Sequence, residues 1–378
     1  MAKAYQVVVV GARAVGREMV RVLRQRRFPL AGLRVLAIHA RQIQVDGQSY
    51  QVEEVSEEAF QGADIALFAG RDKREGHFGW AAARQGAVVI DNGAAYRLYP
   101  NVPLVVPEVN PEALRQHEGL IASPNCSTIQ LVVALKSLHD AARIKRVVVS
   151  TYQAVSGRGA SEKGTEPVNQ LFAEMRSLVE RLDGSAPQQE APDERMQRLL
   201  ELAPLGAEEA VTDRTLFPHP IAANLLPHID SFAEAGYTRE ELKLVRETRK
   251  LMGDENMQIT ATAVRVPVFN AHSESVNVEF HQPLSAAEAR RLLEQAPGIK
   301  VVDDPAGARY PMPLEVSGTD EVFVGRIRED RTVPHGLNLW VVADNLRKGA
   351  ALNAVQVAEK MIEMGLLRPR SQSGVAVS

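Results

Sequence analysis

Cys126 is the one cysteine among the 378 residues, and its position suggests a nucleophile. It follows Asn125 and comes just before an apolar run with helical spacing that begins at Ile129. A thiol at the start of a helix lies near unpaired backbone N–H groups and the positive end of the helix dipole, which favour the thiolate. A lone cysteine is also a common small buried residue, so the thiol needs partners before it indicates chemistry.

Chemistry with a thiolate also needs a proton donor or acceptor and a cation for an anionic substrate. Arg265 and His272 stand at the two ends of a short connection between predicted strands, so their side chains could converge. The guanidinium would hold a carboxylate bidentately, and the imidazole would move a proton near neutral pH. The chain contains nine histidines, so one histidine near a strand is little evidence by itself. The sequence does not show whether either group reaches Cys126.

A turn near the N-terminus is the candidate phosphate site. It lies between the first predicted strand and a helical pattern, and it contains Gly11 and Gly16 with Arg13, Ala14 and Val15 between them. In dinucleotide-binding folds, glycines here let a phosphate approach the backbone and the helix N-terminus. Two glycines in a shortened spacing are a weak motif, and a plain strand-to-helix turn is the alternative interpretation.

The residues after the second predicted strand bear on the choice of cofactor. That strand ends without a carboxylate for a ribose diol, and His39 and Arg41 follow it. Both side chains could meet a 2′-phosphate, which favours NADP, with NAD as the alternative. The simpler interpretation is that Arg41 is a solvated loop charge.

Composition and charge exclude several classes of function. The chain is 45% hydrophobic and 24% charged, which is enough apolar material for a core, and its length predicts two domains. A net charge of −3 gives no electrostatic case for a nucleic-acid or acidic-membrane partner. One cysteine cannot form an internal disulfide, no apolar stretch approaches membrane-spanning length, and no signal segment is predicted. A cytoplasmic location is expected.

The first third of the chain alternates short β-branched runs with helical periodicity, which predicts a parallel sheet with crossover helices. The predicted strands are Val7–Val10, Leu33–Ile38, Asp64–Phe68, Ala87–Ile90, Leu104–Val106 and Leu120–Ala122. This pattern is typical of a doubly wound, Rossmann-like α/β domain. We expect that dinucleotide-binding domain to comprise residues 1–125 and a C-terminal helix at 346–368 that folds back on it.

Residues 126–345 are expected to form an α+β catalytic and dimerisation domain. Its predicted strands are Arg146–Val155, Gln258–Val268 and Ser275–Phe280. A variable segment at about 161–214 interrupts the pattern, and it contains an amphipathic helix from Val168 to Leu182 and a polar linker at Ser185–Glu194. We predict that this helix is a docking or dimer face.

Five blocks of sequence carry a family resemblance. They are Ser123–Thr128, Val148–Gly157, Phe217–Ala222, Arg265–Glu274 and Val341–Gln356. In this order and spacing they resemble the bacterial aspartate-semialdehyde dehydrogenases, except over the segment from Ser161 to Arg214. The resemblance implies a homodimer without a metal that reversibly converts L-aspartyl 4-phosphate to L-aspartate 4-semialdehyde and inorganic phosphate with NADP. That reaction belongs to lysine, threonine and methionine biosynthesis.

The resemblance also assigns roles to single residues. Cys126 would form a thiohemiacetal and an acyl thioester, His272 would be the acid and base, and Gln153 would orient the intermediate. The other implied contacts are Arg265 with the α-carboxylate, Glu240 with the amino group, Asn125 with the substrate, Arg97 and Lys243 with phosphate, and Ser156, Gly157 and Asn345 with the nicotinamide.

The cofactor side departs from the family pattern. The family turn is commonly Gly-Ala-Thr-Gly-Ala-Val-Gly, and this chain lacks one residue and the middle glycine. The Ser-Ala-Gly-Gly loop of the family reads Ala69-Gly70-Arg71-Asp72 here, and its Arg-Ser pair reads Arg41-Gln42. Arg13 and Arg71 would then replace backbone contacts with side-chain contacts to phosphate. Two alternatives stay open: a paralogue with impaired cofactor binding that acts as a regulatory or interaction subunit, and a reductase of N-acetylglutamyl phosphate.

Overall fold

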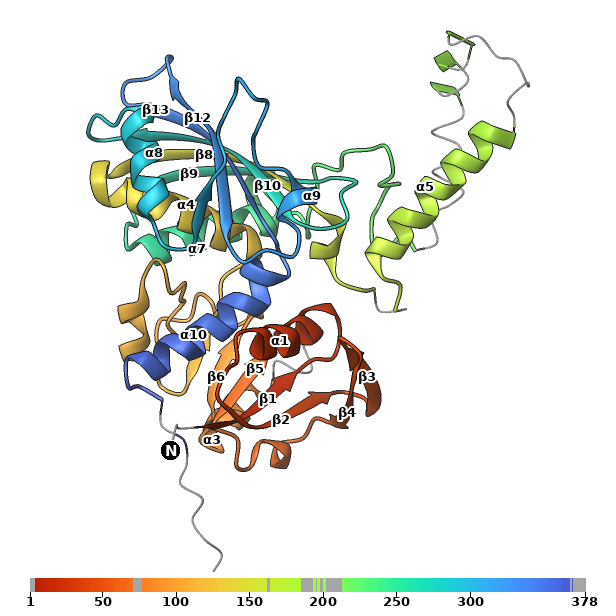
Figure 1. Ribbon diagram of the computed structural model, residues 1–378, viewed down its shortest axis with the longest axis vertical. Helices are drawn as coiled ribbons and strands as arrows, with labels where there is room; N and C mark the ends of the chain where they lie inside the picture. The colour runs from red at the N-terminus through yellow and green to blue at the C-terminus, as the bar shows by residue number, and fades with distance from the viewer. Residues whose placement is uncertain are drawn as a thin grey trace, which may run out of the picture.

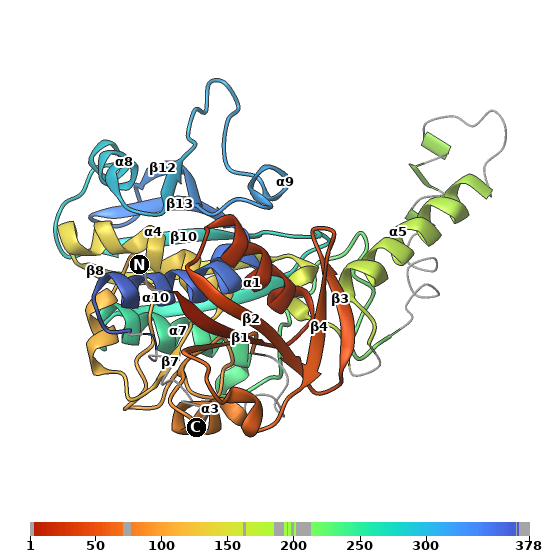
Figure 2. The same ribbon diagram turned by 60° about the horizontal axis from the view of Figure 1, so that its bottom comes forward.

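The computed structural model describes residues 4–70, 77–161, 164–184, 213–367 and 369, with short pieces at 193–194, 196–197 and 200–201. Two lobes lie one above the other, and a helical arm extends from the upper lobe (Figures 1 and 2). The predictions for Arg71, Asp72 and most of the linker at Ser185–Glu194 lie outside the described residues.

The lower lobe contains a seven-stranded sheet in the order β3-β4-β2-β1-β5-β6-β7. Its strands are β1 (Tyr5–Val10), β2 (Leu30–Ala37), β3 (Arg41–Val45), β4 (Gln48–Glu54), β5 (Ile65–Phe68), β6 (Val88–Asp91) and β7 (Leu120–Ala122). All neighbours are parallel except β3 and β4, which form an antiparallel hairpin at one edge. The hairpin turns at Asp46 and Gly47, both with positive φ, as a type I′ turn requires.

Helices cover both faces of this sheet. They are α1 (Ala14–Gln25), α3 (Phe78–Arg84) and α10 (Leu352–Glu363), with short 3₁₀ turns η1 (Glu58–Phe60) and η2 (Pro111–Gln116). Successive strand residues point to opposite faces, so Val7 and Val9 lie in one core with α1 and α10. Val8 and Val10 lie in the other core, which includes residues of α3. The predicted Rossmann-like fold class is confirmed.

One predicted strand, Leu104–Val106, is wrong. In the described part of the chain this run makes a single bridge, between Leu104 and Ala122. Prolines flank it at positions 103 and 107, and a proline cannot donate a hydrogen bond to a sheet ladder. The β-branched composition of the run is therefore outweighed by its neighbours.

The upper lobe contains a six-stranded mixed sheet in the order β11-β12-β13-β10-β8-β9. Its strands are β8 (Ile144–Gln153), β9 (Gln258–Arg265), β10 (His272–Phe280), β11 (Ile299–Val301), β12 (Val322–Asp330) and β13 (Gly336–Ala343). Its other elements are α4 (Cys126–Ala142), α7 (Arg239–Met252), α8 (Ala286–Gln295), α9 (Pro313–Val316), η3 (Val155–Arg158) and η4 (Glu234–Gly236). The turn η5 (Arg347–Ala351) contacts α1 and α10 as well as α4, so it lies at the junction of the lobes. α4 is packed against α7, α8 and β10, so its start is held at the junction with the lower lobe.

The arm is α5 (Pro167–Gly184), which extends away from the upper lobe (Figures 1 and 2). Its inner face places Leu171 and Leu178 in a small apolar core. On its outer face Phe172, Met175 and Val179 are 59%, 42% and 55% exposed. The predicted amphipathic helix is therefore present, and its second apolar face is uncovered within the described chain.

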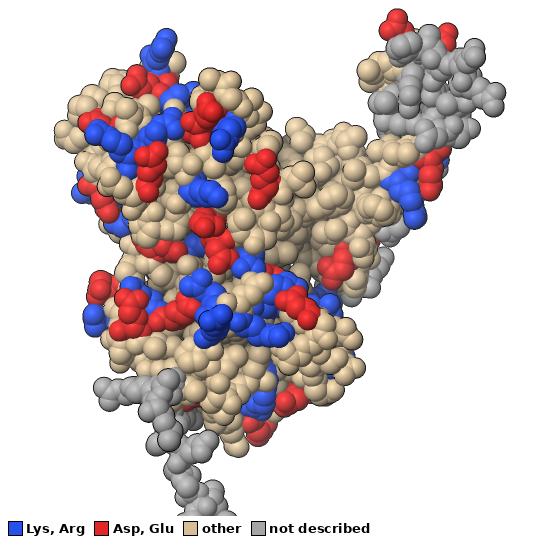
Figure 3. All heavy atoms as spheres, viewed as in Figure 1, with Lys and Arg blue, Asp and Glu red and all other residues tan. Residues whose placement is uncertain are grey.

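Charged side chains gather where the two lobes meet, whereas the visible surface between the upper lobe and the arm is largely uncharged (Figure 3). The chain passes between the lobes before Cys126 and again after Asp344. The turn η5 that follows the second passage contacts α4, so the two passages lie side by side. The sequence motifs of both passages are thereby brought to the same junction.

Candidate active site

Cys126 is the first residue of α4 and is half-buried. Asn125 caps the helix, since its Oδ1 accepts a hydrogen bond from the Ser127 N–H at 3.0 Å. The backbone N–H of Asn125 donates to Glu247 Oε2 at 2.6 Å. The thiol is therefore held at a capped helix start whose preceding peptide is fixed by a carboxylate from another helix.

Glu240 joins three of the predicted site residues. It lies in the first turn of α7, a helix fixed at its start by a capping box between Thr238 and Glu241. Its Oε1 accepts hydrogen bonds from Asn125 Nδ2 at 3.0 Å and Gln153 Nε2 at 3.1 Å, and its Oε2 accepts one from Lys243 at 3.1 Å. The carboxylate is thus the common acceptor for groups from α4, β8 and α7.

The charge of Glu240 is set by a competition between burial and its partners. Burial alone would raise the pKa of this carboxyl. The Lys243 ammonium and the hydrogen bonds from Gln153, Lys243 and Asn125 outweigh it and lower the pKa to about 2. In Lys243, burial opposes the charged form, but Glu240 and Asp230 raise its pKa. Both groups are therefore ionised at neutral pH.

Arg97 and Glu247 form a second buried pair beside the first. Arg97 Nη1 lies 3.0 Å from Glu247 Oε1, and both side chains are nearly fully buried. Arg97 Nη2 donates to the backbone oxygen of Asn92 at 2.7 Å. Glu247 thus holds both the predicted phosphate-binding arginine and the residue before the thiol.

Arg265 and His272 both hydrogen-bond to the backbone of one residue, Ala154. The Ala154 N–H donates to His272 Nδ1 at 3.0 Å, and Arg265 Nη1 donates to the Ala154 oxygen at 2.7 Å. Because Nδ1 accepts a hydrogen bond, the neutral ring carries its proton on Nε2. The structure therefore brings together the two residues that the sequence placed at the ends of one connection.

Gly157 closes this group from one side. A Cβ built on Gly157 would lie 2.7 Å from His272 Nε2 and 3.1 Å from Arg265 Nη1. Only a glycine leaves room for both side chains at this position. Gly157 lies in η3, directly after the predicted nicotinamide contact Ser156.

Asn345 ties the connection before His272 to η3. Its Oδ1 accepts from the Ala271 N–H at 3.0 Å, and its Nδ2 donates to Ser156 Oγ at 3.0 Å. Ala271 has φ of +70°, a left-handed conformation that is strained for a residue with a side chain. The hydrogen bond from Asn345 holds that strained residue directly before His272.

These contacts form one connected set around the thiol. A Cβ built on Gly349 would lie 2.8 Å from Cys126 Cβ and 3.6 Å from Asn345 Cβ, so Cys126 and Asn345 lie on the same side of that glycine. From Asn345 the contacts continue through Ser156 to Gly157, which adjoins His272. On the other side, Asn125 shares Glu240 with Gln153.

Three residues of this set were missed by the sequence patterns: Glu247, Asp344 and Gly349. Glu247 had a usable signal, because it lies seven residues after Glu240 and so on the same face of one helix. Asp344 also had a local signal, because an aspartate can cap a helical turn through the N–H groups two and three residues after it. Gly349 had none, because its contact with Cys126 is far away in the chain.

The dinucleotide turn keeps its tight geometry with two glycines. Gly11 has φ of +107°, and a Cβ on Gly16 would lie 1.7 Å from the Gly11 oxygen, so neither position tolerates a side chain without rearrangement. α1 begins at Ala14, and the side chain of the preceding Arg13 is exposed. The start of α1 can therefore receive a phosphate, with a cation beside it.

His39 and Arg41 are exposed at the carboxyl end of β2. The pairing of Val10 with Leu36 puts that end next to the turn after β1. Arg41 is the first residue of β3 and pairs with Val52, so it is a strand residue and not a loop charge. The predicted cofactor cations therefore share one edge of the sheet.

The described residues contain no group of three or more His, Cys, Asp or Glu side chains arranged to hold a metal ion. Across the same residues, no helix combines the length and apolar character that crossing a membrane requires.

Comparisons with known proteins agree along nearly the whole chain. Residues 6–117 match the model of the semialdehyde dehydrogenase NAD binding domain, and residues 135–348 match the model of the semialdehyde dehydrogenase dimerisation domain. The aspartate-semialdehyde dehydrogenase of Aquifex aeolicus is 46% identical over 96% of this chain and 99% of its own length. The chain belongs to the aspartate-semialdehyde dehydrogenase family.

Other members of the aspartate-semialdehyde dehydrogenase family give the same result. The Synechocystis relative is 40% identical over 96% of this chain and 98% of its own. A crystal structure of aspartate semialdehyde dehydrogenase II complexed with ASA from Vibrio cholerae is 37% identical, with a TM-score of 0.81 and coverage of 96% of this chain and 99% of that one. The resemblance predicted from five sequence blocks is confirmed, and the first lobe belongs to a family of pyridine-nucleotide binding domains.

Proposed function

We propose that this family member catalyses the NADP-dependent, reversible reductive dephosphorylation of L-aspartyl 4-phosphate to L-aspartate 4-semialdehyde. The observation that carries the proposal is the connected set of contacts around Cys126. It joins a thiol at a helix start to an imidazole, three cationic side chains and two amides. An acyl phosphate needs cations for its leaving phosphate and a soft acceptor for its acyl group, and this set provides both.

In the proposed mechanism the Cys126 sulfur attacks the acyl carbon, the carbon–oxygen bond to phosphate breaks, and a thioester forms. The proposed phosphate ligands are Arg97 and Lys243. When bound, the cofactor supplies the hydride that reduces the thioester carbon. With its proton on Nε2, His272 donates a hydrogen bond to the oxygen that becomes negative. That oxygen re-forms the carbonyl as the tetrahedral intermediate opens to the aldehyde and releases the Cys126 thiolate. The backbone N–H of Cys126 is the proposed second donor to that oxygen.

Charged side chains would hold the amino-acid end of the substrate, which lies opposite the acyl phosphate. The α-carboxylate would meet Arg265, and the ammonium group would meet Glu240, which is ionised at neutral pH because its pKa is lowered to about 2. A carboxylate has about four acceptor positions, and Asn125, Gln153 and Lys243 use three of them. Gln153 would then orient the intermediate bound to the thiol.

NADP is the proposed cofactor. Gly11 and Gly16 would let its pyrophosphate approach the start of α1, with Arg13, Ala14 and Val15 beside it. The 2′-phosphate would meet Arg41, which is exposed at the same edge. The nicotinamide would lie along Ser156, Gly157 and Asn345, where the missing side chain of Gly157 lets its backbone lie against the buried His272 ring.

We also propose a homodimer, which is supported by the match to a dimerisation domain. The outer face of α5, with Phe172, Met175 and Val179, is the proposed contact with the second copy. Sedimentation of Phe172→Glu should give monomers where the unchanged protein gives dimers, and an unchanged dimer would exclude this face. Glu180→Lys on the same exposed helix is the control.

We also propose the domain boundaries of the enzyme, its pathway and its cellular compartment. Residues 1–125 and 346–368 would form the nucleotide domain, and 126–345 the catalytic domain. The reaction would serve lysine, threonine and methionine biosynthesis. A thiol nucleophile requires a reducing compartment, which fits the cytoplasm.

A steady-state assay tests the function. Purified protein should reduce NADP in the presence of aspartate semialdehyde only when inorganic phosphate is added. Activity with an N-acetylglutamyl substrate and none with aspartate semialdehyde would select the other reductase. Failure to bind NADPH at millimolar concentration would select the paralogue that acts as a regulatory or interaction subunit.

A further inference from the structure

The turn η5 is a π-helical turn at the junction of the two lobes. The N–H groups of Gly349 and Ala351 donate to carbonyls five residues earlier, those of Asp344 and Leu346, each at 3.0 Å. Asp344 Oδ1 fixes the start of the turn by accepting from the N–H groups of Leu346 and Arg347 at 2.8 and 2.9 Å. Such turns are rare and occur frequently at functional sites. This one contacts α1 of the lower lobe and α4 of the upper lobe.

Gly349 is the residue of this turn that lies against Cys126. A Cβ on Gly349 would lie 2.8 Å from Cys126 Cβ and 3.3 Å from Cys126 Cα. The backbone of η5 therefore approaches Cys126 more closely than any residue with a side chain would permit. Movement of the turn toward α4 would displace Cys126.

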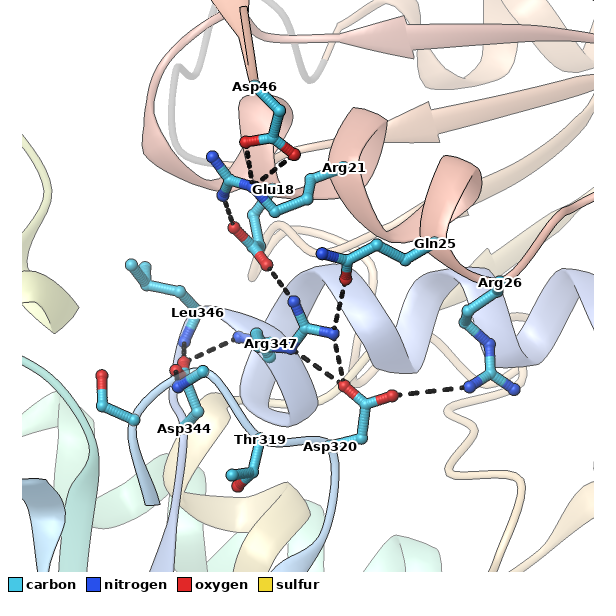
Figure 4. A network of polar contacts seen from close by, with 12 residues as sticks. Glu18, Arg21, Gln25, Arg26, Asp46, Thr319, Asp320, Asp344, Leu346 and Arg347 are labelled. Carbon is cyan, nitrogen blue, oxygen red and sulfur yellow. Dashed lines mark hydrogen bonds and ion pairs between the residues drawn. The ribbon is translucent and has the colours of Figure 1, made fainter. Parts of the chain in front are cut away.

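Arg347, two residues earlier, anchors the same turn to α1 (Figure 4). Its Nη1 donates to Glu18 at 2.7 Å and its Nη2 to Gln25 at 3.0 Å, both residues of α1, and its Nε donates to Asp320 at 2.9 Å. The Arg347 and Glu18 side chains are almost fully buried. The helix that Arg347 holds is the one whose start forms the proposed phosphate site.

Lys348 provides a second anchor on the lower lobe. Its ammonium is buried and lies 2.7 Å from both carboxylate oxygens of Glu108. Arg347 and Lys348 of η5 therefore both contact the lower lobe, and the next residue, Gly349, contacts Cys126. A π-helical turn held in this way behaves as a short rigid connection between α1 and Cys126.

We propose that Arg347 and Gly349 are positioning residues that fix the Cys126 sulfur relative to the nucleotide lobe. Arg347 acts through the backbone of η5, and Gly349 acts by allowing that backbone to lie against Cys126. The proposal rests on the proposed function only in taking Cys126 as the nucleophile.

Alkylation by iodoacetamide tests the proposal without depending on turnover, because the chain has one cysteine and the reagent reports on Cys126 alone. The rate should be measured as a function of pH in Arg347→Met and Gly349→Ala. The matched control is Arg26→Met, because Arg26 also pairs with Asp320 but lies outside η5. Both test variants should change the pH profile, and kcat should fall by about 10- to 100-fold, as expected for misplacement by about 1 Å. Arg26→Met should keep the alkylation rates across the pH range and kcat within about twofold of those of the unchanged protein.

Unchanged alkylation profiles in both folded test variants would overturn the proposal, as would an equal change in Arg26→Met. If Arg347→Met fails to fold, Glu18→Gln removes the partner on α1 and leaves the Asp320 contact, and it should alter the profile in the same direction. A wild-type protein that reacts with iodoacetamide but has no dehydrogenase activity would refute the proposed function, and the comparison of alkylation profiles would still decide the role of η5.

Discussion

The thiol site and the dinucleotide turn are built in opposite ways. Around Cys126, the charged side chains of Glu240, Glu247 and Arg265 are buried and hydrogen-bonded to partners from other elements. Around the turn, the side chains of Arg13 and Arg41 are exposed to solvent. The first region is preorganised by the fold, whereas the second presents its charged side chains to solvent.

This difference predicts how each region responds to substitution. Removal of one partner from a buried, preorganised pair lowers the free energy of unfolding substantially, because the remaining partner stays buried and unpaired. An exposed cation loses little stability and affects only the ligand it meets. Substitutions of the buried charged residues at the thiol site should therefore change turnover and folding, and those at the turn should change cofactor affinity alone.

The largest effect is expected for Cys126→Ser. Serine is nearly isosteric but is a far poorer nucleophile at neutral pH, so kcat should fall by at least about 1,000-fold. Circular dichroism and thermal unfolding should match the unchanged protein, because Asn125 still caps α4. Turnover at the unchanged rate would refute the thioester mechanism.

Glu240→Gln should remove an acid-sensitive part of the stability. The pKa of Glu240 falls from 4.5 to about 2 on folding, so its contribution is complete above pH 4.5 and is lost as the pH drops through about 2. That difference corresponds to up to about 3 kcal/mol. Urea unfolding between pH 7 and pH 2 should show a smaller loss in the variant than in the unchanged protein.

Glu234→Gln is the control for that series, because Glu234 is an exposed acid whose ion pair with Arg246 of α7 is also exposed. It should retain the full acid-dependent loss. An equal loss in Glu240→Gln and the unchanged protein would show that the buried hydrogen bonds do not favour the charged carboxylate.

Arg41→Ala should raise KM for NADP by about tenfold, the usual value of one hydrogen bond to a charged group, and leave KM for NAD unchanged. Its thermal stability should not change, because the side chain is exposed. Arg24→Ala, an exposed cation near the other end of α1, is the control and should change neither constant. Parallel changes with both cofactors would place the 2′-phosphate elsewhere.

The smallest effect tests whether every buried acid of the upper lobe is stabilising. Glu274 lies on β10, two residues after His272, and is fully buried; burial raises its pKa well above 4.5, against a hydrogen bond with Gln130. Its contribution is present below pH 4.5 and is lost as the pH rises toward the folded-state pKa. Glu274→Gln should therefore melt higher than the unchanged protein at pH 8, by about 1–2 °C, and the gap should close near pH 4. A variant that melts lower at pH 8 would contradict this sign.

Local patterns predicted the parts of the molecule whose structure is set by neighbours in sequence. The strands β1 and β7 and the helix α5 follow from β-branched runs and apolar periodicity, and they lie where the patterns put them. The hairpin of β3 and β4 was missed, although Asp46 and Gly47 form a strong turn signal. The run at Leu104–Val106 was overpredicted because its flanking prolines were given too little weight.

The site was predicted by residue type and not by contact. The sequence indicated Cys126, Arg265 and His272 as chemical groups and predicted that Arg265 and His272 converge, but it could not place Cys126 relative to them. The hydrogen bond from Asn125 to Glu247 spans 122 residues, and no local pattern encodes a partner so far away. The π-helical turn was predicted as ordinary helix, because the carbonyls it uses depend on anchors in the other lobe.

The position of α10 has a consequence for synthesis on the ribosome. Its apolar residues fill a core under β1 and β5, strands that leave the ribosome more than two hundred residues earlier. At roughly 5–20 residues per second, the part of that face that α1 does not cover stays exposed for on the order of ten seconds or more. The nascent chain must therefore be shielded during that interval, and messages truncated before α10 should yield aggregates in place of a free nucleotide-binding fragment.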